Sequence, residues 1–252
     1  MDIVPNISQT KWILVRGLMR DKRHWQDFIG SLSAAVTAFN IDVIALDCLG
    51  NGEFSHEKSP LSIAAYANAL LEQLEGSDNC IIGLSMGGMI ALEMARLAPD
   101  KVSKVVVINT SAANLSPWYR RFSLIAVLAA FRKRNRNHGI DCLEATALKL
   151  SSEGYGDNHA IAKRWTELRL QNRVEFFNVL RQIWACARFR CCDSLQQPIV
   201  VFSGKLDKLV SPECSKLIAE HYRCQHIEFT DAGHDISLDS SAALIAQLKA
   251  VL

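Results

Sequence analysis

The chain has 252 residues, of which 49% are hydrophobic and 21% are charged, and its formal net charge is +2. These proportions exclude a disordered or fibrous protein, and the length suits one catalytic domain that carries an insertion. The charge is unevenly distributed, because residues 112–192 hold 14 basic and 6 acidic side chains, a balance of +8, whereas the remainder holds 14 basic and 20 acidic side chains, a balance of −6.

Short runs rich in β-branched residues recur along the chain and predict strands. Each run is nearly continuous in apolar residues, which is typical of a parallel sheet covered on both faces. The predicted strands are Trp12–Val15, Asp42–Leu46, Cys80–Leu84, Lys104–Ile108, Ile199–Ser203 and His226–Phe229. Predicted helices over Ile63–Leu74, Met89–Ala98 and Cys214–His221 lie between strands. The alternation indicates an α/β fold, with a doubly wound, mostly parallel sheet.

The alternation stops between Ser111 and Pro198, where the pattern predicts helices and no strand. The expected helices cover about 117–134, 140–151, 158–171 and 173–190. An insertion between two parallel strands is expected to lie over the carboxyl ends of the strands, where ligands bind in such folds. We therefore predict a helical cap, or lid, over residues 112–196, and a core formed by residues 1–111 and 197–252.

The segment Gly-Leu-Ser-Met-Gly-Gly at 83–88 follows a predicted buried strand and opens a predicted helix. This is the context of the GxSxG nucleophile elbow, in which a sharp turn exposes the serine hydroxyl. The alternative is an ordinary serine at a helix N-cap, flanked by glycines through chance. The strand before and the helix after favour the elbow, so we predict that Ser85 is a nucleophile.

A serine nucleophile needs a base, and histidine, with an ordinary pKa near 6.5, suits that task. We choose His234, because it follows the last predicted strand and so lies at the same edge of the sheet as Ser85. The other six histidines (His24, His56, His138, His159, His221 and His226) lack this placement.

A buried carboxylate must orient the imidazole, and Asp207, just after the strand Ile199–Ser203, is our candidate. Three competing aspartates lie so near to His234 in the sequence that they are badly placed to reach the ring from behind. They are Asp231, Asp235 and Asp239.

The tetrahedral oxyanion of acyl transfer requires two hydrogen-bond donors. One is expected to be the backbone N–H of Met86, which directly follows the nucleophile. The other is expected from the loop after the first strand, where Gly17 lets the backbone turn toward the site and Leu18 is the better-placed donor. Each such donor contributes about 3 kcal/mol to transition-state stabilisation.

With these motifs the chain resembles the α/β-hydrolase superfamily over residues 11–110 and 197–252. Arg16-Gly17, the segment 47–52 (Asp-Cys-Leu-Gly-Asn-Gly), the elbow at Ser85, Gly204 to Asp207 and Gly233-His234 occur in the order that the family uses. The resemblance implies a helical cap, no cofactor, and hydrolysis of esters through an acyl-enzyme. Two positions depart from the family pattern, since Arg16 stands where His is usual and Leu49 where Pro is usual. Arg16 either binds a substrate carboxylate or forms a structural salt bridge.

We therefore expect a serine esterase acting on a small or medium acyl ester. The apolar cap residues Trp118, Phe122 and Trp184 are candidates for the pocket wall, or else form the cap's own core. The size and basic cap are weakly similar to carboxylesterases that cleave methyl esters on acyl-carrier protein. We therefore expect one of two roles for a group of basic residues. They either contact an acidic carrier protein or phosphopantetheine, or they form a solvated cationic face. The members of this group are Arg120, Arg121, Arg132, Lys133, Arg134 and Arg136.

Two other functions remain open at this point. The same triad can act mainly in proton transfer, as in a carbon–carbon hydrolase or a cofactor-free lyase of the same fold. A ligand-binding protein that kept the fold and lost the chemistry is the other alternative. Nucleic acid is not an expected partner, because the core is acidic and no recognition motif is present.

The remaining sequence features point to an ordinary cytoplasmic enzyme. The start, MDIVPNISQT, has no basic and then apolar run of a secretory signal. The longest apolar stretch, near residues 124–131, is far shorter than the roughly 20 residues that cross a bilayer. The eight cysteines are spread along the chain without a CxxC motif, so we expect reduced structural thiols and no metal site.

Overall fold

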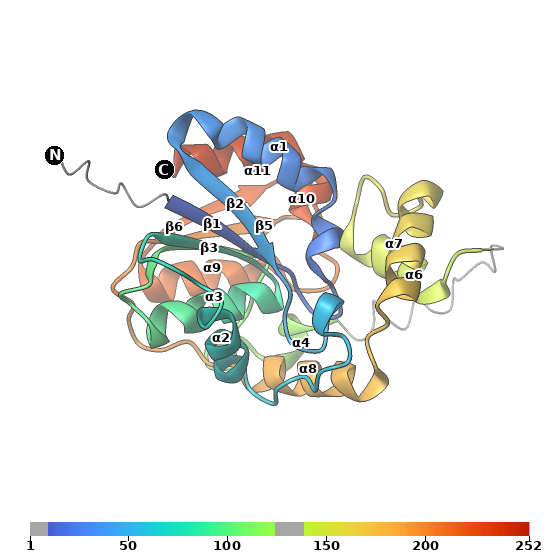
Figure 1. Cartoon of the computed structure of the whole chain (residues 1–252), viewed down its shortest axis with the longest axis horizontal. Helices are drawn as coiled ribbons and strands as arrows, with labels where there is room; N and C mark the ends of the chain where they lie inside the picture. The colour runs from blue at the N-terminus through green and yellow to red at the C-terminus, as the bar shows by residue number, and fades with distance from the viewer. Residues whose placement is uncertain (1–9, 124–138, 252) are drawn as a thin grey trace, which may run out of the picture.

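The computed structural model describes residues 10–123 and 139–251, and its centre is a six-stranded, all-parallel sheet. The spatial order of the strands is β2-β1-β3-β4-β5-β6 (Figure 1). Their bounds are β1 Thr10–Val15, β2 Ile41–Leu46, β3 Asn79–Leu84, β4 Val102–Ile108, β5 Ile199–Gly204 and β6 Gln225–Phe229. All six strands predicted from the sequence are thereby confirmed, as is the doubly wound α/β class.

Both faces of the sheet are covered because successive strand residues point to opposite sides and both sets are apolar. On β1, Trp12 and Leu14 pack against one layer of helices, whereas Ile13 and Val15 pack against the other. Helices α1 (Asp27–Val36) and α11 (Ser241–Ala250) form the first layer. Helices α2 (Ile63–Leu71), α3 (Met86–Leu97) and α9 (Pro212–Tyr222) form the second (Figure 1).

Helices α1 and α11 were not predicted from the sequence, and their starts differ. Helix α1 begins after Gln26, whose backbone has a φ of 48° and whose side chain makes no cap hydrogen bond. Helix α11 follows the short helix α10 (Ile236–Asp239) directly, and Ser240 likewise makes no side-chain cap bond. At α1 the N-cap residue is therefore not of a type that marks a helix start, whereas Ser240 is a usual N-cap residue and was an available signal for α11 that the prediction did not use.

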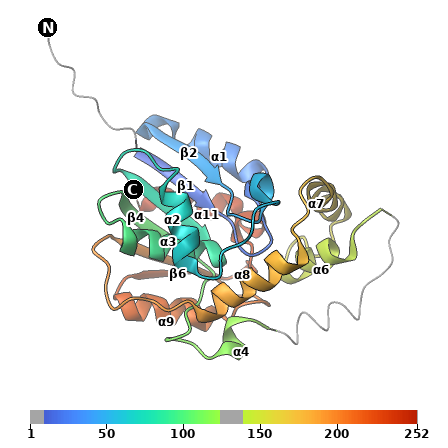
Figure 2. The ribbon, with the colours of Figure 1, turned by 60° about the horizontal axis from the view of Figure 1, so that its bottom comes forward.

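Four helices, which we call the cap helices, lie between β4 and β5 in the described residues. They are α4 (Trp118–Arg121), α6 (Cys142–Ser151), α7 (His159–Gln171) and α8 (Phe176–Arg188). The expected helix over 117–134 is described only to Arg121, because Phe122 is already extended and residues 124–138 lie outside the described ranges. Helices α6 and α7 stand beside the sheet, while α8 crosses its lower side (Figure 2).

The cap helices have two different cores. Leu148 of α6 packs with Trp165 and Leu168 of α7 in a small cluster separate from the sheet. Helix α8 instead joins the main core through Ala185, and Phe189 follows it there. No helix within residues 10–123 and 139–251 is long and apolar enough to span a bilayer.

Candidate active site

Ser85 lies at the sharp turn from β3 into α3, in a backbone conformation that few non-glycine residues adopt. Its φ is 60° and its ψ is −117°, and its N–H donates to the carbonyl of Ile108 on β4 at 2.8 Å. The turn depends on close backbone packing, because a Cβ atom at Gly87 would lie 2.2 Å from the carbonyl oxygen of Val15. The sequence thus holds the serine in a strained turn at the carboxyl edge of the sheet.

His234 and Asp207 meet at the same edge, from the loops after β6 and β5. The Nδ1 atom of His234 lies 2.6 Å from Oδ2 of Asp207, whose side chain is fully buried. The other carboxylate oxygen accepts from the N–H groups of Leu209 at 2.8 Å and Val210 at 2.9 Å, which fix its orientation. Because Nδ1 is hydrogen-bonded to Asp207, Nε2 is the ring nitrogen that remains available for a proton transfer.

The three competing aspartates have other partners. Asp231 accepts from the hydroxyl of Ser240 at 3.0 Å, and Asp239 accepts from the N–H of Gly233 at 2.7 Å. Asp235 contacts Arg16. Although these residues lie nearer to His234 in the sequence, each carboxylate is directed to another group, and Asp207 is the aspartate that the structure brings to the ring.

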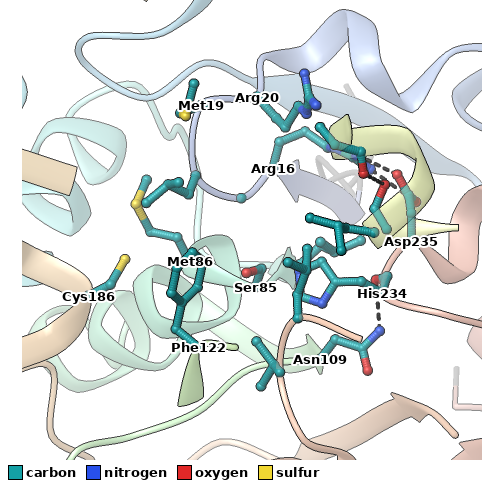
Figure 3. A pocket seen from close by; sticks show the side chains of 18 of the residues that line it. Arg16, Met19, Arg20, Ser85, Met86, Asn109, Phe122, Cys186, His234 and Asp235 are labelled. Atoms are coloured by element: carbon teal, nitrogen blue, oxygen red, sulfur yellow. Dashed lines mark hydrogen bonds and ion pairs between the residues drawn. The ribbon is translucent and has the colours of Figure 1, made fainter. Parts of the chain in front are cut away.

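Ser85 and His234 line the same cavity, with the imidazole next to the serine in the close view (Figure 3). Within the described residues no hydrogen bond joins the two side chains, and such contacts often tighten only when a substrate binds. The histidine loop is fixed from below by Asn109, at the end of β4, whose side-chain amide donates to the carbonyl of His234 at 2.7 Å. Its amide oxygen accepts from the N–H of Gly204 at 2.8 Å.

Two backbone N–H groups beside Ser85 are free to bind an oxyanion. Met86 and Leu18 line the cavity, and the N–H group of neither residue donates to an acceptor within residues 10–123 and 139–251. Gly17 allows the Leu18 loop to approach, because a Cβ atom there would lie 2.9 Å from the Cβ of Ser85. The structure therefore brings both expected donor residues to the cavity that Ser85 lines.

A buried glutamine on α8 fixes the Leu18 loop from the cap side. The Oε1 atom of Gln182 accepts from the N–H of Met19 at 2.9 Å, and its amide nitrogen donates to Oδ1 of Asn51 at 2.7 Å. Asn51 in turn donates to the carbonyl of Arg20 at 3.1 Å. Sequence reasoning missed Gln182, and its polarity gave little signal because Arg181 directly precedes it and Asn178 lies one turn earlier.

Arg16 forms a buried ion pair. Its Nη2 atom lies 2.6 Å from Oδ2 of Asp235, and its guanidinium stacks over Trp25 at 4.6 Å. Burial raises the pKa of Asp235, but the charge of Arg16 and hydrogen bonds from Arg16 and Ser237 outweigh burial, so the pKa is lower than usual. Of the two roles expected for Arg16, this geometry favours the structural salt bridge, which joins the Leu18 loop to the His234 loop.

The cavity around Ser85 has a volume of about 510 Å³, within the range of small-molecule sites. Its walls are largely apolar, with Met86, Met89, Leu143, Leu150, Ile183 and Val210 among the contributors. Trp118 and Phe122 line it as expected, but Trp184 does not. Trp184 is 53% exposed and does not face the cavity, and the guanidinium of Arg188 lies 5.3 Å from the centre of its ring. The prediction that Trp184 contacts the substrate is therefore wrong. The alternative that these aromatic residues form the core of the cap is also wrong, since Trp118 is 70% exposed.

The basic residues expected either to meet a carrier protein or phosphopantetheine or to form a solvated cationic face do not share one environment. Arg120 is exposed on α4, whereas Arg121 is buried and bonded to the end of α8. The prediction is therefore wrong in treating Arg121 as a surface residue. Four further members, Arg132, Lys133, Arg134 and Arg136, lie outside the described residues.

The cysteines and acidic groups of the described residues form no further reactive centre. No disulfide bond joins two cysteines of the described residues, and burial raises the pKa of Cys80 and Cys186 to about 12. In the described part of the chain, no group of three or more His, Cys, Asp or Glu side chains converges in a way that would hold a metal ion.

Comparisons with known proteins agree with this fold. The sequence model described as "Alpha/beta hydrolase family" matches residues 12–248. The 3-oxoadipate enol-lactonase 2 of Acinetobacter baylyi is 24% identical over 220 residues, covering 83% of this chain and 78% of that protein. Homoserine O-acetyltransferase of Thermus thermophilus is 29% identical over 127 residues, or 48% of this chain, which spans 33% of that relative's length. A thermophilic esterase of Thermogutta terrifontis has a TM-score of 0.69 at 20% identity, covering 96% of this chain and 89% of that one.

Proposed function

Because this chain belongs to the alpha/beta hydrolase family, we propose that it is a serine hydrolase that cleaves a carboxylic ester with Ser85, His234 and Asp207 as its triad. The observation that carries the proposal is the convergence at one cavity of a strained serine, a histidine bonded to a buried aspartate, and two unoccupied N–H donors. Each group is of little chemical use alone, and together they supply nucleophile, base and oxyanion stabilisation.

In the first half of the proposed reaction, the Oγ atom of Ser85 attacks the ester carbonyl carbon while Nε2 of His234 takes the hydroxyl proton. The carbonyl π electrons move to oxygen, and the N–H groups of Leu18 and Met86 stabilise the resulting oxyanion. Asp207 holds the ring in the required tautomer and stabilises the imidazolium. When the tetrahedral intermediate collapses, the carbon–oxygen bond to the alcohol breaks, and His234 gives its proton to the departing oxygen.

In the second half, water attacks the acyl carbon of the ester now formed with Ser85. His234 takes a proton from the water as the oxygen–carbon bond forms, and the same two N–H groups stabilise the second oxyanion. Collapse breaks the bond between the acyl carbon and Oγ of Ser85. His234 returns the proton to Oγ, so the enzyme is regenerated and a carboxylic acid leaves.

A substrate with a small or medium acyl group suits the cavity of about 510 Å³ and its apolar walls. The relative named 3-oxoadipate enol-lactonase adds cyclic esters to the substrates that merit testing. We also propose that residues 112–196 act as a lid, since α4, α6, α7 and α8 contribute Trp118, Leu143, Trp165 and Ile183 to the cavity lining.

A panel of p-nitrophenyl esters of increasing acyl length, extended by simple lactones, tests the proposal together with a fluorophosphonate probe. We expect turnover of short and medium esters, and labelling of the wild type but not of Ser85→Ala. Removal of the nucleophile is expected to reduce kcat on the order of 10⁶-fold, with folding retained by circular dichroism.

Two other outcomes would overturn the esterase and point to the remaining alternatives. Labelling of Ser85 with no turnover of any ester would favour a carbon–carbon hydrolase or lyase that uses the same triad. Absence of both labelling and turnover in folded protein would favour a ligand-binding protein on the hydrolase fold.

A further inference from the structure

Arg121, the last residue of α4, is a buried cation in the wall of the Ser85 cavity. It is 9% exposed and lines the cavity beside Trp118 and Phe122. Its Nη1 and Nη2 atoms donate to the carbonyls of Ala187 at 2.8 Å and Cys186 at 2.5 Å, near the end of α8. Its Nε atom donates to the hydroxyl of Ser111 at 3.3 Å.

The partners of Arg121 differ from those of the two other arginines in the cavity wall. Arg16 lies 2.6 Å from Asp235, and Arg20 lies 2.5 Å from Glu144. Among the described residues, no carboxylate lies within 4.0 Å of a guanidinium nitrogen of Arg121, and residues 124–138 include no Asp or Glu in their sequence. Within the described residues, the hydrogen-bond acceptors of the guanidinium are therefore all neutral.

The neutral acceptors compensate only part of the charge. The carboxyl end of a helix contributes the equivalent of roughly half a negative charge, so the carbonyls of α8 leave a positive remainder. A guanidinium has five N–H donors, and the three hydrogen bonds that Arg121 makes to the described residues use three of them, so two have no acceptor within residues 10–123 and 139–251. A buried charge without an opposite charge is costly, and an anionic ligand group in the cavity would remove that cost.

Arg121 lies on the β4 side of the nucleophile. The hydroxyl of Thr110 donates to the carbonyl of Ser85 at 2.7 Å, and the next residue, Ser111, accepts from Arg121. Arg16, in contrast, follows β1 on the other side of β3. A ligand group at Arg121 would thus lie to one side of the reacting ester, between apolar walls that include Phe122 and Val210.

Building on the proposed esterase function, we propose that Arg121 forms an anion subsite, and that the substrate is a carboxylic ester bearing a second, ionised carboxylate. The remaining N–H groups of the guanidinium receive the carboxylate oxygens, while the ester carbonyl lies at Ser85. Exclusion of water by the apolar walls strengthens the ion pair relative to one at the protein surface.

Two matched pairs of esters test the subsite and distinguish the part of the substrate that carries the charge. Monomethyl glutarate and methyl 5-oxohexanoate differ on the acyl side, where a carboxylate is replaced by a neutral methyl ketone. The pair 4-acetoxybenzoate and 4-acetoxybenzamide differ on the alcohol side. Acid release in a pH-stat gives kcat/KM for each, and we expect the anionic member of one pair to be preferred by about tenfold to a hundredfold.

The variants R121Q, R121K and R120Q connect that preference to one residue. We expect the anionic-to-neutral ratio of kcat/KM to fall to one or below in R121Q and to be partly retained in R121K. Arg120 is the matched control, because it lies on the same helix but is exposed and does not line the cavity, and R120Q is expected to keep the ratio of the wild type. Equal rates within both pairs for the wild type, or an unchanged ratio in R121Q, would overturn the subsite.

A binding measurement tests the subsite independently of the esterase activity. It does not require the R121Q variant to hydrolyse any ester. Calorimetry with Ser85→Ala is expected to detect butyrate binding about tenfold or more tighter than butyramide binding, and this difference is expected to vanish in the double variant with R121Q. If no ester is hydrolysed and no probe labels Ser85, the esterase fails, yet a charge-dependent difference in this assay still supports the subsite. Equal binding of butyrate and butyramide would overturn the subsite even in an active esterase.

Discussion

The edge of the sheet that carries Ser85, His234 and Asp207 and the wall contributed by α4 and α8 are built in different ways. At the edge, backbone groups hold the reactive residues, as in the strained Ser85 turn and the two N–H groups that hold Asp207, and the side chains of Asn109 and Arg16 add contacts to the His234 loop. In the wall, single side chains reach across long sequence separations, as Gln182 reaches Met19 and Arg121 reaches Cys186. The difference suggests that the core determines the chemistry and the cap helices determine geometry and choice of substrate.

The largest expected effect tests the edge itself. Asp207→Asn keeps the shape of the side chain but removes the carboxylate that accepts from Nδ1 of His234, so the imidazole is expected to adopt the wrong tautomer. We expect kcat to fall about 10⁴-fold in an ester hydrolysis assay. The matched control is Asp231→Asn, whose carboxylate contacts Ser240 instead of the ring. Comparable losses in the two variants would contradict the choice of Asp207.

The next effect concerns the ion pair that joins two loops of the edge. Arg16→Met leaves the fully buried Asp235 without its cation, so the free energy of unfolding is expected to fall by about 3–5 kcal/mol in urea titrations. The double variant with Asp235→Asn is expected to lose less than the sum of the two single variants, because the pair is coupled. Additive losses would mean that Arg16 and Asp235 stabilise the fold independently.

A smaller effect is expected where the wall supports the edge. Gln182→Ala removes the acceptor of the Met19 N–H, so the neighbouring Leu18 donor is expected to lose its fixed position. Complete loss of one oxyanion donor costs about 10²–10³-fold in kcat, and we expect this indirect change to cost less, mostly in kcat rather than KM. Asn178→Ala is the control, because Asn178 lies on the same helix and bonds Ser59 but not the Leu18 loop. A loss confined to KM would place Gln182 in substrate binding instead.

The smallest effect is a dependence of stability on pH. The pKa of Asp235 is below its usual value, so the unfolded chain binds a proton more readily than the folded one as the medium becomes acidic. The stabilisation is fully present above the ordinary aspartate pKa of about 3.9 and is lost as the pH falls through the lower folded value. Urea titrations from pH 5 down to pH 2 are expected to show that the free energy of unfolding of the wild type declines below about pH 4, and that this decline is smaller in the double variant with Arg16→Met and Asp235→Asn.

Much of the edge was predictable from the sequence because local patterns encode it. The strands are continuous apolar runs, and the elbow at Ser85 combines a strand, a glycine-flanked serine and a helix in consecutive residues. Asp207 and His234 follow strands directly, so topology alone brings them to one edge. Asn109 was missed, although a polar residue that ends a buried strand has the same kind of signal.

The wall was less predictable because the burial of its side chains depends on how the cap helices pack. Trp118 and Trp184 are both cap tryptophans, yet one lines the cavity and the other faces away from it. Arg120 and Arg121 are adjacent and chemically identical, but Arg121 alone is buried. Helical periodicity does not distinguish these cases, since the answer depends on where α8 ends relative to α4.

Mass spectrometry of the protein quenched during turnover of an activated ester tests the central claim most directly. If Ser85 is the nucleophile, the intact protein gains the mass of one acyl group during the reaction, and fragmentation assigns the modification to Ser85. Slowing deacylation with Asp207→Asn is expected to change the occupancy of this species but not its position. Turnover with no acylated Ser85 under conditions that trap a serine ester, or acylation at another residue that is required for activity, would contradict the account.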